Sequence, residues 1–160
     1  MAQAKKSTKR TAESEGSYAG FSDEEREAMK DHAKELKASS RGGAKAEKAA
    51  EEAAAVVEKI AGFDEPDRVL GERIHALVQE NAPELAPRLW YGMPAYARDG
   101  RIVCHFQPAQ KFKTRYATIG FSDAAHLDDG AFWPVGYALT TLSAADEKRI
   151  AALIKQAAAG

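Results

Sequence analysis

The sequence is poor in cysteine and has no long apolar run. Cys104 is the only cysteine in 160 residues, which excludes an internal disulfide and a thiolate-rich zinc site. No window approaches the roughly 18 consecutive apolar residues of a membrane-spanning helix, and the N-terminus lacks the apolar segment of a signal peptide. We therefore expect a soluble, cytoplasmic protein with no membrane partner.

A large net charge is also missing. The formal net charge is −1, so nothing global attracts the chain to nucleic acid or to an anionic membrane. The charge is unevenly distributed, however. Residues 21–82 carry ten basic and fifteen acidic side chains, whereas residues 83–160 carry nine basic and seven acidic ones.

Sequence motifs of common enzymes are absent as well. The chain has no glycine-rich phosphate loop, no Ser/His/Asp nucleophile elbow and no HExxH helix. Cys104 alternates with Ile102 and Phe106, which is typical of a small core residue, and no base is paired with it in the sequence. We expect a protein that is not an enzyme.

The N-terminal half has helical periodicity. Residues 1–20 hold almost no apolar side chains and are predicted to be a disordered tail. Ser22 and Glu25 have capping-box spacing and predict a helix to about residue 38, with few apolar residues and hence a peripheral position. Further helices are predicted over residues 45–61 and 64–81. We therefore expect residues 21–63 to form a helical extension and residues 64–160 to form the main domain.

From Arg88 the apolar period changes to two. Strands are predicted over residues 88–91, 95–98, 101–107, 114–121 and 135–142, and Ser143 is predicted to cap a last helix to about residue 158. Asp99-Gly100 is the dipeptide of a type I′ hairpin turn. The sequence predicts an α+β fold, in which helices cover one face of an antiparallel sheet of four to five strands.

Aromatic and basic side chains suggest a binding surface. Lys111, Lys113 and Arg115 are spaced by two, which on an extended segment would put the three cations on one face. The candidate ligand-binding residues are Trp90, Tyr91, Met93, Tyr96, Lys111, Lys113 and Arg115. They would suit a small anionic ligand or a protein partner. The alternatives are a solvated strand face and, ranked last, nucleic-acid contact helped by the basic residues of the tail.

A loop between two predicted strands suggests a metal site. His126 and Asp128 have the His-x-Asp spacing of facial-triad iron sites, and Asp123 and Asp129 lie beside them. The alternative is an ordinary turn, in which the carboxylates cap local amides.

Four segments together resemble the YdhG-like domain family, long catalogued as a domain of unknown function. They are residues 90–96 (Trp-Tyr-Gly-Met-Pro-Ala-Tyr), 100–103, 111–121 and 131–134. The resemblance covers roughly residues 64–158. It implies a compact α+β domain similar to the frataxin fold, and some relatives are described as iron chaperones that deliver Fe(II).

For this chain the resemblance implies weak, carboxylate-rich Fe(II) binding. The candidate ligands are His126, Asp123, Asp128 and Asp129 in the loop, and Asp64, Glu65 and Asp67 at the start of the third helix. Those last three acids also suit a helix N-terminus for reasons unrelated to metal. Fe(II) handling is thus the leading hypothesis from sequence, with the anionic-ligand or protein-binding module as its alternative.

Overall fold

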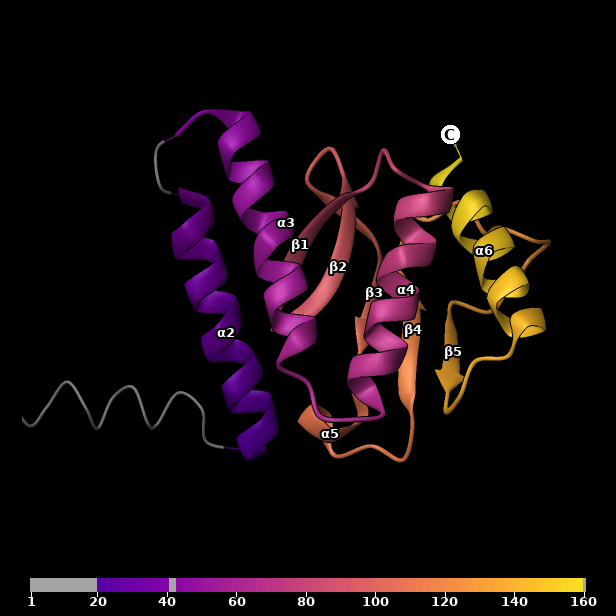
Figure 1. Ribbon diagram of the computed structural model, residues 1–160, viewed down its shortest axis with the longest axis horizontal. Helices are drawn as coiled ribbons and strands as arrows, with labels where there is room; N and C mark the ends of the chain where they lie inside the picture. The colour runs from indigo at the N-terminus through magenta and orange to yellow at the C-terminus, as the bar shows by residue number, and fades with distance from the viewer. Residues whose placement is uncertain (1–19, 41–42, 160) are drawn as a thin grey trace, which may run out of the picture.

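The computed structural model describes residues 20–40 and 43–159 (Figure 1). Three helices come first, followed by a sheet that is interrupted by a short helix, and then a final helix. The elements are α2 (Asp23–Ser40), α3 (Lys45–Ala61), α4 (Asp67–Asn81), β1 (Ala86–Trp90), β2 (Met93–Arg98), β3 (Arg101–Gln107), α5 (Ala109–Phe112), β4 (Ala117–Phe121), β5 (Gly136–Leu139) and α6 (Ala144–Ala158). The predicted α+β class is confirmed. The predicted disordered tail lies outside the described residues, apart from Gly20.

Both helix starts predicted from a serine cap have a capping box. The Ser22 hydroxyl accepts a hydrogen bond from the amide of Glu25 over 3.2 Å, and the Glu25 carboxylate accepts one from the amide of Ser22 over 2.9 Å. Ser143 and Asp146 exchange the same two bonds at the start of α6. The bond from the Ser143 amide holds the pKa of Asp146 below its usual value. These caps satisfy amides that the first helical turns leave without partners.

The sheet is an antiparallel meander in the order β1-β2-β3-β4-β5. Arg98 pairs with Arg101 across the predicted Asp99-Gly100 turn, whose residues have φ of 50° and 79°. Positive φ at both positions is the mark of a type I′ turn, and this prediction is confirmed.

A second two-residue turn joins β1 to β2. Trp90 pairs with Met93, and between them Tyr91 and Gly92 have φ of 53° and 75°. The sequence prediction continued the first strand through Tyr91 and was wrong there, because a bulky aromatic residue rarely adopts positive φ. Something outside the turn must therefore stabilise Tyr91 in this conformation.

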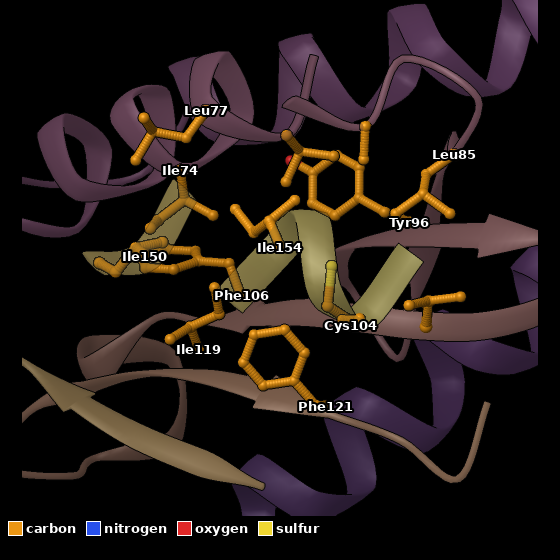
Figure 2. Packing of buried hydrophobic residues seen from close by; sticks show 14 of the residues in the cluster. Ile74, Leu77, Leu85, Tyr96, Cys104, Phe106, Ile119, Phe121, Ile150 and Ile154 are labelled. Atoms are coloured by element: carbon orange, nitrogen blue, oxygen red, sulfur yellow. The ribbon is translucent and has the colours of Figure 1, made fainter. Parts of the chain in front are cut away.

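The main core lies between one face of the sheet and the helices α4 and α6. Figure 2 shows Ile74 and Leu77 of α4 and Ile154 of α6 gathered with Tyr96 and Phe106 of the sheet. Each of these side chains is at least 95% buried. The third predicted helix therefore packs on the sheet, as its apolar stripe indicated.

The helices α3 and α2 follow each other outward from this core, and Figure 1 shows them side by side. Val56 and Ile60 of α3 are buried, and a Cβ placed on Gly71 of α4 would lie only 3.2 Å from Ile60. In α2 only Ala28 is buried. The prediction that this first helix is peripheral is confirmed.

The segment after β3 differs from its prediction. Residues 109–112 form the helical turn α5, Lys113 is left-handed with φ of 52°, and β4 starts only at Ala117. Lys111, Lys113 and Arg115 therefore do not lie on one face of a strand. The Asp67 carboxylate explains the difference, because it accepts hydrogen bonds from the amides of Ala109 and Gln110 and so stabilises the start of a helical turn.

Replacing Ile154 tests the position of the core. Ile154→Ala removes a fully buried side chain, so it is expected to lower the free energy of unfolding by about 2–5 kcal/mol. Val57→Ala is the control, because Val57 is 54% exposed on α3. Urea unfolding followed by circular dichroism measures both variants. Equal losses in the two would contradict the described core.

Candidate functional site

The turn between β1 and β2 directs two consecutive backbone amides at one carboxylate of α2. The amide of Tyr91 donates to Glu35 Oε2 over 2.9 Å, and the amide of Gly92 donates to Glu35 Oε1 over 2.7 Å. These distances are typical of charge-assisted hydrogen bonds. The side chain of Glu35 is only 12% exposed, so both bonds are largely shielded from water. They also explain how Tyr91 is stabilised at positive φ.

A second carboxylate of α2 lies over the same turn. Lys111 Nζ donates to Asp31 Oδ2 over 2.6 Å, and both side chains are mostly buried. A Cβ on Gly92 would lie 2.5 Å from Asp31 Oδ2 and 2.6 Å from Lys111 Nζ. Glycine is therefore required at position 92 by its backbone conformation and by the ion pair against its α-carbon.

Aromatic rings extend this surface along β1. His32 of α2 stacks on Tyr91 with ring centroids 4.0 Å apart and an interplanar angle of 11°. Trp90 meets Tyr91 edge-on at 5.2 Å and meets the His105 ring of β3 at the same distance. Burial lowers the pKa of His105, so this imidazole is mainly neutral at pH 7.

His105 lies on the sheet face opposite the main core, where it covers β4. A Cβ on Gly120 would be 2.4 Å from the His105 ring. Arg88 and His105 both pair with Ala95 and hence share this face. Within residues 20–40 and 43–159, Arg88 Nε and His105 Nδ1 are the buried side-chain polar atoms without a hydrogen-bond partner.

The outer margin of the surface is open to solvent. Lys113 Nζ donates to Glu24 Oε1 over 2.5 Å, which lowers the pKa of Glu24 and raises the pKa of Lys113. A cavity of about 800 Å³ lies here between α2, α3 and α5. Its charged lining includes acids of α2 and α3, the basic Lys59 of α3, and Lys111 and Lys113. Side chains of both charges therefore line this cavity.

Only part of the predicted ligand-binding set comes together. Trp90, Tyr91 and Lys111 form the surface described above, with Lys113 at its edge. Met93 is buried in β2, and Arg115 is exposed with its guanidinium 5.4 Å from the Tyr116 ring. The assignment of Tyr96 to this surface was wrong. Its side chain is fully buried on the helix-covered face.

Buried polar groups in the core have structural partners. The Tyr96 hydroxyl is 2.9 Å from His75 Nδ1, and burial raises the pKa of Tyr96 and lowers that of His75. Burial also raises the pKa of the Cys104 thiol to about 12. The thiol is therefore protonated at neutral pH, in agreement with its interpretation as a core residue.

The predicted iron ligands are dispersed or already engaged. Asp67 is buried against the α5 amides, Glu65 pairs with Arg68, and Asp123 pairs with Arg101. Four of the set are exposed without forming a cluster: Asp64, His126, Asp128 and Asp129. Asp123 and Asp128 line a separate cavity of about 570 Å³ with Phe132 and Trp133.

In the part of the chain that the structure describes, no three His, Cys, Asp or Glu side chains are grouped so as to hold a metal ion. Fe(II) binding stays a prediction.

Sequence reasoning did not assign a functional role to the residues of α2. Asp31, His32 and Glu35 were not among the predicted site residues. Two features of the sequence could have indicated their role. Asp31 and Glu35 are four residues apart and so lie on one face of the helix, and the helix has too few apolar residues to dock by burial alone.

The chain matches no protein-family model, no curated protein and no solved structure. Membership of the YdhG-like family therefore stays a prediction. Of the helices in the described ranges, none combines the length and apolar character that crossing a bilayer requires.

Gly92 offers a test of the contact with α2. Gly92→Ala places a methyl group into the Asp31–Lys111 ion pair and puts alanine at positive φ. We expect it to lower the free energy of unfolding and to raise hydrogen exchange throughout α2.

Gly100→Ala is a matched control for this variant. Gly100 holds the same position in the other type I′ turn, with φ of 79°, and a Cβ there would meet nothing within 4 Å. This variant should lower the free energy of unfolding only by the backbone strain of about 1–2 kcal/mol. Amide hydrogen exchange in α2 should stay unchanged. If both variants changed α2 equally, the described contact would be contradicted.

Proposed function

We propose that this protein is a non-enzymatic binding module that recognises carboxylate groups. Its carboxylate site consists of the backbone amides of Tyr91 and Gly92 and the ammonium group of Lys111. The observation that carries the proposal is the binding of both Glu35 oxygens by two consecutive turn amides. The Asp31 carboxylate, which accepts a hydrogen bond from Lys111 Nζ, is a second carboxylate bound at the same site.

The chemistry of this site suits an anion. Two amides of a tight turn are fixed by the backbone, so little conformational entropy is lost when they bind a ligand. Lys111 adds a positive charge beside them in a place where its side chain is only 12% exposed. A carboxylate offers two acceptor oxygens and a negative charge, and it therefore fits these donors better than a neutral amide or hydroxyl.

The same donors argue against a metal cation here. Amide N–H groups and an ammonium group repel Fe(II), whose preferred ligands are oxygen and imidazole. Of the two hypotheses from sequence, the contacts therefore favour the anionic-ligand or protein-partner module. The aromatic flank of Trp90 and Tyr91 supplies apolar area beside the charged group, as many binding sites do.

The proposal is tested on a full chain from which both resident carboxylates have been removed. Asp31→Ala with Glu35→Ala vacates the site, and alanine preserves the helical propensity of α2. Addition of sodium acetate is expected to shift the amide resonances of Tyr91 and Gly92 in two-dimensional NMR spectra. Sodium chloride of equal ionic strength should leave them in place.

Two lysine variants separate specific binding from general electrostatics. In the vacated chain, Lys111→Met is expected to weaken acetate binding about fivefold, because it removes the partly buried charge. Lys155→Met is the control, because Lys155 is exposed and belongs to α6, which lies at the opposite end of the molecule from α2 (Figure 1). The proposal fails if acetate and chloride act alike on the two turn amides, or if both lysine variants bind acetate as well as the parent.

A further inference from the structure

The helix α2 contributes two acids to the carboxylate site through a fixed spacing. Asp31 and Glu35 are four residues apart, which places their side chains on the same face of the helix, one turn apart. Asp31 meets Lys111 and Glu35 meets the turn amides. His32 lies between them in sequence and stacks on Tyr91. One helical face thus contacts the turn amides, Lys111 and the Tyr91 ring together.

Little apolar burial holds α2 in this position. Ala28 is its only buried residue, and Leu36 is 54% exposed. The docking of α2 therefore depends mainly on its charged contacts with the turn, with Lys111 and, at the margin, with Lys113. A competitor that offers the same charged groups can replace these contacts without disturbing the main core.

We propose, building on the carboxylate-binding function, that the partner of this site is an acidic helix that displaces α2. The partner presents an Asp and a Glu four residues apart, with a flat ring after the Asp to stack on Tyr91. The partner also has a small residue three positions before its Asp, which takes the place of the buried Ala28 of α2. The α2 helix is the intramolecular form of this ligand.

A helix fits the site better than a small free anion for a quantitative reason. A tethered segment competes at an effective concentration on the order of millimolar. A single carboxylate replaces only one of the two α2 contacts and cannot compete at ordinary concentrations. A helix carrying both acids replaces both contacts and the aromatic stack together. The entropy of association is then lost once for all three contacts.

The surroundings of the site favour a partner that carries both acidic and apolar side chains. The cavity of about 800 Å³ beside α2 is lined by Leu89, Phe63 and Pro108 as well as by Lys111 and Lys113. Apolar side chains on the flank of the incoming helix can occupy this space, while its acids meet the lysines. The sheet half of the chain, residues 83–160, has two more basic than acidic residues, which also favours an acidic partner.

The experiment uses the full chain labelled with ¹⁵N and an unlabelled, end-blocked peptide of residues 20–40 as the probe. At saturation the peptide is expected to raise amide exchange in α2 of the labelled chain, while exchange in α4 stays unchanged. A matched peptide with Asn and Gln in place of Asp31 and Glu35 is expected to have no effect. Glu35→Ala in the labelled chain should tighten peptide binding at least about tenfold, because the resident competitor is weakened.

The outcomes separate this inference from the function on which it rests. If the vacated chain binds acetate but saturating peptide leaves exchange in α2 of the parent unchanged, the helical partner is refuted and the carboxylate function stands. If the vacated chain binds the peptide no more tightly than acetate, the ligand is a small anion and the inference is again refuted. If the neutral peptide displaces α2 as well as the acidic one, apolar packing drives docking and the inference fails. If neither acetate nor peptide binds the vacated chain, both proposals fail.

Discussion

The arrangement around the site depends on one two-residue turn. Tyr91 and Gly92 both have positive φ, and their consecutive amides point at a single carboxylate. Positive φ costs a residue such as tyrosine on the order of 1 kcal/mol. Hydrogen bonds to a charged group contribute about 1.5–3 kcal/mol each, so the two bonds to Glu35 outweigh that strain. The turn and the docked helix α2 therefore stabilise each other.

The two helices of the N-terminal extension are held by different forces. The α3 helix buries Val56 and Ile60, and its contact with Gly71 ties it to α4 by close packing. The α2 helix buries one alanine and relies on its ionised groups. An 18-residue helix with so little burial is marginal by itself in water, because helix nucleation is unfavourable. It is thus the element of the fold best suited to exchange with a ligand.

Much of the fold could be predicted from local patterns, because local physics determines them. Capping boxes at Ser22 and Ser143 marked two helix starts, and Asp99-Gly100 marked a hairpin, since each signal is contained within four residues. The helical turn α5 was missed because its cap, Asp67, lies more than forty residues away in sequence. The Tyr91-Gly92 turn was missed for the same reason, since its stabilising carboxylate comes from α2. The sequence indicated an aromatic and basic surface, but contacts between distant segments decide which residues form it.

The central claim is that two consecutive turn amides bind one carboxylate, and NMR can measure those hydrogen bonds directly. Scalar couplings across a hydrogen bond connect an amide ¹⁵N to the acceptor ¹³C. Our account predicts that the Glu35 carboxylate carbon is coupled to the amide nitrogens of both Tyr91 and Gly92. Absence of both couplings, in a spectrum that resolves the corresponding backbone couplings of the sheet, would contradict it.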